Sequence, residues 1–142
     1  MEIAIEIDLQ WRDIIDNLIH LGMAYLLALP MAYDREHSHN GAGLRTFPLV
    51  AVASCGYALI AMSVLEGAEA QSKMLQGIIT GIGFIGGGAI LKNNQSTSET
   101  ATAASIWNMG LIGIAIAYSR YEIAILLAVI NFITLRYVKK FK

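Results

Sequence analysis

Long stretches without charged side chains alternate with short charged segments along the chain of 142 residues. A helix needs about 20 predominantly apolar residues to cross the hydrocarbon core of a bilayer. Three stretches meet this length directly, another does so if Asp16 and Asn17 lie among the lipid headgroups, and the last is shorter. In chain order, the stretches without Asp, Glu, Lys or Arg are residues 18–33, 46–65, 74–91, 100–119 and 123–135.

These stretches lack the polar stripe that recurs about every 3.6 residues on a surface helix of a soluble protein. Residues 77–91 read GIITGIGFIGGGAIL and contain a single hydroxyl group, that of Thr80. Five such stretches leave too little polar sequence to cover a soluble surface. The pattern therefore predicts an all-α, polytopic transmembrane bundle with about five spans.

The fifth stretch is the weakest span, because residues 123–135 would cover only about 20 Å of a core about 30 Å thick. Flanking Tyr and charged side chains can reach the interfaces and lengthen it. Charge sorting also favours an odd number of crossings, with the N-terminus outside and the C-terminus in the cytoplasm. The basic residues then lying inside are Arg35, Arg45, Lys92, Arg136, Lys139, Lys140 and Lys142, against Arg12, Lys73 and Arg120 outside.

The segments before and after the spans divide the chain further. Residues 1–17 combine acidic side chains with apolar residues three and four apart, which favours an amphipathic helix lying on the membrane. Alternating apolar residues over Ile3–Leu9 leave a short extended arm open as the alternative. We expect a transmembrane domain over residues 18–138 and a basic cytoplasmic tail over residues 139–142.

Composition agrees with a membrane protein and excludes several other classes. Hydrophobic residues make up 56% of the chain and charged residues 15%, which excludes a disordered chain. Ten basic against eleven acidic residues disfavour a nucleic-acid binder. The lone Cys55 excludes an intramolecular disulfide and is expected to be a small buried apolar residue. No nucleophile–base pair, phosphate-binding loop or set of metal ligands occurs at catalytic spacing, so we expect no enzyme activity.

Glycines in the third stretch leave two interpretations open. Pairs four residues apart, Gly77 with Gly81 and Gly83 with Gly87, favour a tightly packed central helix, because small residues let helix backbones approach in lipid. Alternatively, the run Gly86–Gly88 breaks the helix and exposes carbonyl groups able to coordinate a cation. The full set is Gly77, Gly81, Gly83, Gly86, Gly87 and Gly88.

The fourth stretch also carries small residues, from Thr100 to Ser105 and again at Gly110 and Gly113. We therefore expect the third and fourth spans to pack against each other. Polar side chains inside spans should face the bundle interior, with Asn108 and Asn131 forming hydrogen bonds between helices. No Asp, Glu, Lys or Arg lies in the middle of a span, which argues against a strongly coupled proton or sodium transporter.

The connection between the first two stretches is densely charged. It contains Asp34, Arg35, Glu36 and Arg45, followed by Thr46. One interpretation is a solvated loop whose arginines follow the positive-inside rule. The other is a packed ion-pair cluster, or a site for a divalent cation such as magnesium on Asp34 and Glu36. Two carboxylates beside two guanidinium groups favour ion pairs over a metal.

Three segments resemble the MgtC/SapB family of bacterial inner-membrane proteins: DREHSHNGAGLRT (34–46), GIITGIGFIGGGAIL (77–91) and TATAASIWNMGLIGIAIA (100–117). Asp34 stands where the family usually has Glu, and Gly87 where it often has Ala. The family's marked positions fall on Arg35, Glu36, Gly43, Leu44, Arg45 and Thr46, on Gly81, Gly83, Phe84, Gly86 and Gly88, and on Thr102, Ala103, Ala104, Ser105 and Trp107, next to Asn108.

The resemblance implies a multi-pass inner-membrane protein linked to growth at low magnesium, and to virulence in some bacteria. It also implies a short form, without the soluble C-terminal domain that some members carry. We expect a role in magnesium or cation homeostasis or stress adaptation, through assembly with itself or with another membrane protein. No cofactor is expected other than magnesium. The alternative is a magnesium channel or transporter with a broken glycine helix.

Overall fold

The computed structural model describes residues 10–37, 43–92 and 97–138, and within these ranges the chain is helical and contains no strand. Each charge-free stretch forms the body of one helix, so the predicted all-α bundle is confirmed. The five helices are α1 (Trp11–His37), α2 (Thr46–Val64), α3 (Ala68–Lys92), α4 (Thr97–Ala117) and α5 (Tyr121–Tyr137).

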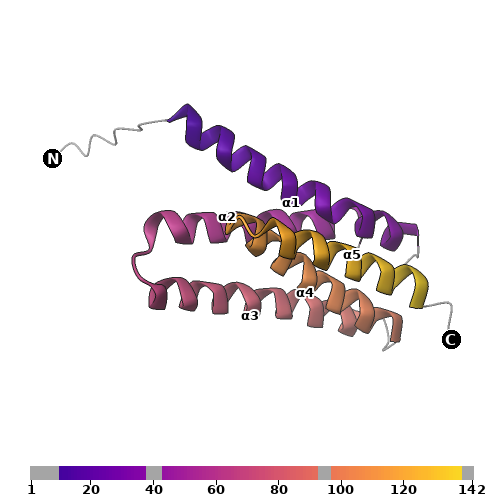
Figure 1. The fold of residues 1–142 in the computed structure, drawn as a ribbon. Helices are drawn as coiled ribbons and strands as arrows, with labels where there is room; N and C mark the ends of the chain where they lie inside the picture. The colour runs from indigo at the N-terminus through magenta and orange to yellow at the C-terminus, as the bar shows by residue number, and fades with distance from the viewer. Residues whose placement is uncertain (1–9, 38–42, 93–96, 139–142) are drawn as a thin grey trace.

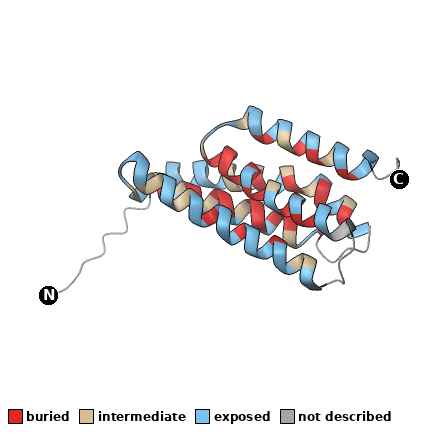
Figure 2. Cartoon of the chain, turned by 90° about the horizontal axis from the view of Figure 1, so that it is seen from below, coloured by how far each residue is buried: buried red, intermediate tan, exposed pale blue. Residues whose placement is uncertain are grey.

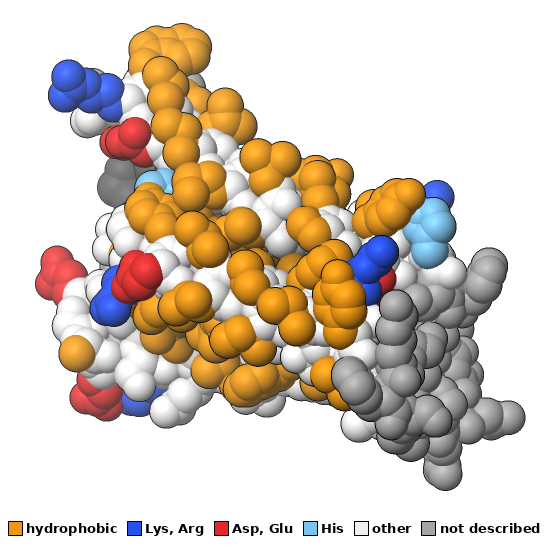
Figure 3. Space-filling model, turned by 45° about the vertical axis from the view of Figure 1, so that its right-hand side comes forward, with side chains coloured by type: hydrophobic (Ala, Val, Ile, Leu, Met, Phe, Trp, Pro, Cys, Tyr) orange, Lys and Arg blue, Asp and Glu red, His pale blue; other side chains and the backbone are white. Residues whose placement is uncertain are grey.

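Successive helices run in opposite directions along the bundle, so α1 begins at one end and α5 finishes at the other (Figure 1). The end where α1, α3 and α5 finish is called the Arg35 end below. The opposite end contains the start of α3 and is called the Lys73 end. Figure 3 shows hydrophobic side chains over the middle of one face and charged side chains towards its ends. This distribution is expected when lipid surrounds the middle of a bundle.

Four helices, α1 to α4, are long and apolar enough to cross a membrane. Helix α5 has 17 residues, which is about 26 Å of helix. It runs towards the Arg35 end in contact with α1 and α4, and it begins further from the Lys73 end than α3 does (Figure 1). The structure therefore contains the five helices that the sequence predicts, and α5 is the shortest of them.

Helix α4, rather than α3, is the central helix. It contacts all four other helices, and 67% of its apolar window is buried, against 11% for the window in α3. In Figure 2 the buried residues gather where helices meet. Helix α3 contacts α4 and α2 and, within the described ranges, neither α1 nor α5. The predicted packing of the third and fourth spans is confirmed, whereas the prediction of a central, tightly packed glycine helix is wrong.

The reason for this difference is that the glycines of α4 make the close contacts. A Cβ atom at Gly113 would collide with the carbonyl oxygen of Ala51 in α2 and lie 2.9 Å from the backbone nitrogen of Cys55. Gly110 is similarly close to the side chain of Ile82 in α3. Sequence spacing identifies small residues that permit close approach, but it does not say which of two glycine-bearing helices occupies the centre.

Local sequence explains where the helices begin and end. Pro48 lies in the first turn of α2, where a missing N–H group leaves no helical hydrogen bond unmade. Gly67 has a φ of 87° in the connection to α3, a conformation that favours glycine. The α4–α5 turn places Ser119 at a φ of 56°. There the backbone N–H of Arg120 donates to the carbonyl of Ala115 at 2.8 Å, which satisfies the end of α4.

Helix α1 continues without interruption across residue 17, where the sequence suggested a boundary between an interfacial segment and the first span. Its residues 11–19 are all exposed, and Figure 1 shows this part of α1 diverging from the bundle. Trp11 at its start is 74% exposed. Residues 1–9 and the predicted tail, 139–142, lie outside the described residues.

Candidate functional site

A buried arginine occupies the Arg35 end of the bundle. The side chain of Arg35 is 3% exposed, and its Nη2 atom donates hydrogen bonds at 3.4 Å to the Asp34 carboxylate and to the backbone carbonyl of Leu135 in α5. A guanidinium group taken out of water requires compensating partners, because its desolvation costs several kcal/mol. Arg35 therefore connects α1 to α5 through its main-chain contact with Leu135, and its ion pair with Asp34 lies within α1.

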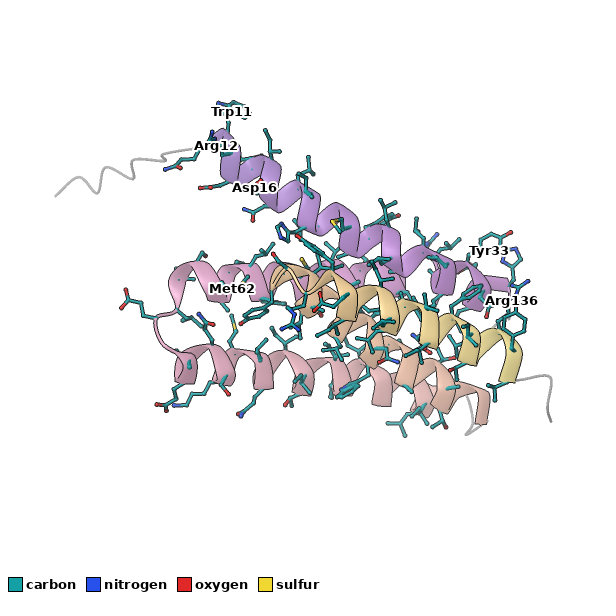
Figure 4. All side chains as sticks on the ribbon, in the orientation of Figure 1. Trp11, Arg12, Asp16, Tyr33, Met62 and Arg136 are labelled. Carbon is teal, nitrogen blue, oxygen red and sulfur yellow. The ribbon has the colours of Figure 1, made fainter. Side chains whose placement is uncertain are left out.

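Asp34 lies between two arginines. Its Oδ2 atom accepts from Arg35, and its Oδ1 atom accepts from Nη1 of Arg136 at 3.4 Å. The Arg136 side chain is 54% exposed, and its guanidinium lies over the ring of Phe132, 5.8 Å from the centroid. Figure 4 shows Arg136 close to Tyr33 at this end, far from Trp11 and Arg12. The packed ion-pair interpretation of the charged segment therefore describes Asp34 and Arg35 correctly.

One polar atom of this cluster lacks a hydrogen-bond partner among the residues that the structure describes. The Nε atom of Arg35 is buried and makes no hydrogen bond among the described residues. Buried donors without partners are uncommon in folded proteins, because each loses its hydration without replacement. The two contacts of Nη2, both at 3.4 Å, are also long for charge-assisted hydrogen bonds. The Arg35 guanidinium is thus held incompletely by the described chain.

Glu36 binds the backbone at the start of α2, whereas Asp34 pairs with arginines. One of its carboxylate oxygens accepts a hydrogen bond from the backbone N–H of Leu44 at 3.0 Å, just before α2 begins. A carboxylate at this place also interacts favourably with the helix dipole. Gly43 makes the approach possible, because a Cβ atom there would collide with the Glu36 carboxylate and lie 3.0 Å from its Cα. The contact holds the start of α2 against the end of α1.

The remaining residues of the predicted charged segment are less involved. Arg45 is exposed, and within the described ranges it forms no salt bridge. Thr46 is partly buried and begins α2. The solvated-loop interpretation therefore fits Arg45, and the ion-pair interpretation fits the two residues at the end of α1. Residues 38–42 of the connection lie outside the described residues.

Asp34 and Glu36, the candidate metal ligands, each have protein donors as partners. In the part of the chain that the structure describes, no three His, Cys, Asp or Glu side chains gather as a metal site would require. The chemistry of the cluster is that of ion pairing and main-chain recognition.

A second polar contact lies deeper, between α4 and α5. The Oγ atom of Ser105 is 2.9 Å from the carbonyl oxygen of Ala101 and 3.1 Å from Oδ1 of Asn131. A hydroxyl group has one proton and cannot donate fully to both acceptors. With the amide turned over, Nδ2 of Asn131 would donate to Oγ while Oγ donates to Ala101, which removes the competition for the hydroxyl proton. The predicted interhelical hydrogen bond of Asn131 is confirmed.

The Asn131 amide shares a property with Arg35. Its Nδ2 atom is buried and has no partner in the described residues, and turning the amide over places the oxygen in that position instead. Asn131 lies one turn before Leu135, whose carbonyl accepts from Arg35. Two polar groups without a full set of hydrogen bonds among the described residues, the Arg35 guanidinium and the Asn131 amide, therefore lie at the inner face of the last turns of α5.

The other family-like residues of α4 differ in position. Thr102 and Ser105 are buried, whereas Trp107 is 47% exposed on the outside of the helix. Asn108 is partly buried, and its side chain makes no hydrogen bond to any residue that the structure describes. The interhelical hydrogen bond predicted for Asn108 is therefore absent among the described residues. In α4 it is Ser105, one turn earlier, that forms the hydrogen bond to α5.

The glycines of α3 form neither a helix break nor a central packing surface. Helix α3 is continuous through Gly86, Gly87 and Gly88, so the broken-helix interpretation is wrong for this structure. Its hydrogen bonds continue through the glycines because glycine lowers helix propensity by only about 1 kcal/mol per residue. Gly86 faces α4, because a Cβ atom added to Gly86 would lie 3.3 Å from the carbonyl oxygen of Ala103.

The other five α3 glycines have open space around them. Among the described residues, and apart from the helix's own neighbouring backbone, no heavy atom lies within 4 Å of a Cβ built at Gly77, Gly81, Gly83, Gly87 or Gly88. The exposed residues Gly83, Phe84, Gly87 and Gly88 lie on the side of α3 away from the bundle and are called the outward face below. Phe84 is 84% exposed. A large ring among unhindered glycines is a shape that another helix can pack against in lipid.

Several important residues were missed by sequence reasoning. The contact of Leu135 involves a backbone atom, which leaves no mark in side-chain chemistry, whereas Gly43 was among the positions that the family resemblance marked. Arg136 gave a usable signal, because the charge distribution places it at the same membrane surface as Asp34 and Arg35. That placement was predicted, but the shared ion pair was not.

Comparisons with known proteins agree with these features. The model of the MgtC family matches residues 21–142. The chain is 31% identical over 104 residues to "Protein MgtC" of Brucella suis biovar 1 (strain 1330), covering 73% of this chain and 43% of that protein. It is 30% identical over 125 residues to "Putative magnesium transporter YhiD" of Escherichia coli (strain K12), covering 83% and 58% respectively.

A third relative is "Protein SapB" of Bacillus subtilis (strain 168), which is 30% identical over 122 residues, covering 80% of this chain and 53% of that protein. The chain thus spans about half the length of the curated relatives it matches. No solved structure matches the chain significantly. The family match covers the charged cluster and helices α2 to α5 in full, and the chain belongs to the MgtC family.

Proposed function

We propose that the protein works in the bacterial inner membrane, in magnesium or cation homeostasis or stress adaptation, by assembling with itself or with another membrane protein. The outward face of α3 is the contact surface in this proposal. The observation that carries it is the open space around Gly83 and Gly87. In lipid, exposed apolar area drives little association, so close backbone approach at small residues becomes the main source of helix affinity.

The Arg35 end is cytoplasmic in this proposal. Its described charged residues include three arginines, Arg35, Arg45 and Arg136, and basic residues near helix ends favour the cytoplasmic surface. The Asp34–Arg35–Arg136 cluster then has a structural role at the membrane edge, where it joins α1 to α5. Family membership and the magnesium-related name of one relative support the physiological part of the proposal.

Complementation in the native bacterium tests this function. A strain lacking the gene should grow poorly when magnesium is limiting, and the wild-type gene should restore growth. Gly83→Leu and Gly87→Leu should fail to restore it at equal membrane abundance, because a side chain there holds the partner helix away. The matched control is Gly22→Leu in α1, where a Cβ also meets nothing within 4 Å.

Full complementation by both α3 variants would contradict the role of the outward face. Equal growth of the deletion strain and the wild type in limiting and replete magnesium would contradict the magnesium part of the proposal. The two results are independent, so each part can fail alone.

A magnesium channel or transporter is the second candidate, supported by the name of the Escherichia coli relative. The continuous α3 removes the unwound carbonyls at residues 86–88 that this mechanism would use. Flux into liposomes that contain only this protein distinguishes the two functions. Magnesium uptake above that of empty liposomes would favour transport, and its absence would favour assembly.

A further inference from the structure

A groove opens between α2 and α3 on the outside of the bundle. It adjoins the outward face of α3, because Gly77 and Gly81 in the groove lie seven residues, or about two turns, before Phe84 and Gly88. Its volume is about 430 Å³. Residues from both helices line it, including Ala53 and Tyr57 of α2 and Gly77 and Gly81 of α3. These four residues are exposed, so the groove is open to the surroundings of the bundle. The glycines widen it, because a large side chain at either position would project into this space.

The floor of the groove is part of the folded core. Ile78 and Ile82 of α3 line it and are buried. Helix α4 lies behind this floor, since the Ile82 side chain contacts the position of Gly110. The floor is therefore rigid and apolar, and the groove is a fixed feature of the way α2, α3 and α4 pack.

The length and the apolar lining of the groove fit an extended hydrocarbon chain. The groove extends along α3 from Lys73 to Ile85, which is about 18 Å at the rise of an α-helix. An extended hydrocarbon chain, whose carbons contact neighbours at about 4 Å, can lie along a groove of this length between α2 and α3.

Charge distinguishes the two ends of the groove. Lys73 lines the groove at one end, within about two turns of the start of α3. Tyr57 lies about two turns before the end of α2, at a similar distance from this end of the bundle. Lys73 pairs with Glu69 at 2.8 Å, but both side chains are largely exposed, at 72% and 84%. Such a pair contributes little stability, so the ammonium group is available to a phosphate. An aromatic side chain at this depth is typical of the headgroup region.

We propose that the groove between α2 and α3 binds one membrane phospholipid, with an acyl chain along Gly77 and Gly81 and an anionic headgroup at Lys73. The apolar length accounts for the chain, and the single cation at one end accounts for the headgroup. The lipid lies beside the outward face of α3 and covers a part of the helix that assembly through Gly83 and Gly87 leaves open.

Native mass spectrometry of the full chain tests the proposal, after reconstitution into nanodiscs of equal phosphatidylglycerol and phosphatidylethanolamine. The wild type should retain one lipid per chain, with phosphatidylglycerol preferred. Gly81→Leu should abolish retention of both lipids, whereas Gly22→Leu should leave it unchanged. Lys73→Gln should reduce the preference for phosphatidylglycerol about fivefold, and Arg12→Gln, at an exposed cation outside the groove, should not.

Gly77→Leu gives a second variant that fills the groove, should Gly81→Leu fold poorly by circular dichroism. Unchanged lipid retention in folded Gly81→Leu and Gly77→Leu would overturn the proposal. A change in the number of chains per particle with unchanged lipid retention would also overturn it, because the groove would then receive a second copy. Unchanged headgroup preference in Lys73→Gln would overturn the assignment of the anionic end.

Discussion

Arg35 in α1 donates a hydrogen bond at 3.4 Å to the backbone carbonyl of Leu135 in α5, 100 residues later in the chain. This contact joins the first helix to the last at one end of the bundle. Because the Arg35 guanidinium is a buried charge, the stability of the bundle depends on the few groups that compensate this charge. The carboxylate of Asp34 is the described counter-charge nearest to it.

Replacing Asp34 should therefore destabilise the bundle more than replacing Arg136. Asp34→Asn leaves the buried guanidinium without its counter-charge, and we expect the free energy of unfolding to fall by about 3 kcal/mol. Arg136→Gln removes an exposed partner, and we expect a loss below about 1 kcal/mol. Equilibrium unfolding in detergent micelles measures both. Equal losses in the two variants would show that the buried ion pair is not the stabilising element.

Gly43 should tolerate no side chain, because Glu36 occupies the adjacent space. We expect Gly43→Ala to lower the free energy of unfolding by about 1–3 kcal/mol. The matched control is Gly22→Ala, which has open space and replaces a helix-interior glycine, so a gain of up to about 1 kcal/mol is expected. Thermal unfolding followed by circular dichroism compares them. A neutral Gly43→Ala would mean that the Glu36–Leu44 contact adjusts freely.

Glycines of α4 and α3 should respond in opposite ways to the same substitution. Gly113→Ala forces α4 away from Ala51 of α2, and overpacking of this kind costs about 1–3 kcal/mol. Gly87→Ala meets no neighbour and should raise helix stability by about 1 kcal/mol. Unfolding of the two variants in the same detergent gives the comparison. Similar losses in both would contradict the central position of α4.

Ser105 and Asn131 should be energetically coupled. Interhelical hydrogen bonds in membrane bundles contribute about 0.6 kcal/mol on average and up to about 1.7 kcal/mol. We expect the double-mutant cycle of Ser105→Ala and Asn131→Ala to give a coupling energy in this range. Unfolding free energies of the wild type, both single variants and the double variant supply it. Strict additivity would show that the contact contributes nothing measurable.

Much of the fold follows from the sequence, because lipid demands long apolar helices and leaves charges at their ends. All five charge-free stretches became helices for this reason. The arrangement of the helices was harder to predict. Small residues mark surfaces that can approach closely, yet Gly110 and Gly113 pack inside while Gly83 and Gly87 face outward. The spacing of small residues is similar in α3 and α4, so only the three-dimensional packing shows which glycines face inward and which face outward.

The site was partly predictable for a similar reason. Charge proximity in the sequence correctly indicated an ion pair between Asp34 and Arg35. The family-like segment marked Gly43 but not the reason for it, which is the absent side-chain volume beside Glu36. The contribution of Leu135 depends on a main-chain atom, which no residue pattern encodes. Arg136 was placed at the correct end by charge sorting, but its pairing with Asp34 requires α1 and α5 to be neighbours.

The outward face of α3 as an assembly surface is the central claim, and photo-cross-linking in native membranes tests it most directly. A photoreactive phenylalanine analogue replaces Phe84, which is 84% exposed, or Tyr25 in α1, which is 45% exposed. Position 84 should cross-link to a second copy or to another membrane protein several times more efficiently than position 25. Equal protein cross-linking from both positions, or adducts to lipid alone at position 84, would contradict the account.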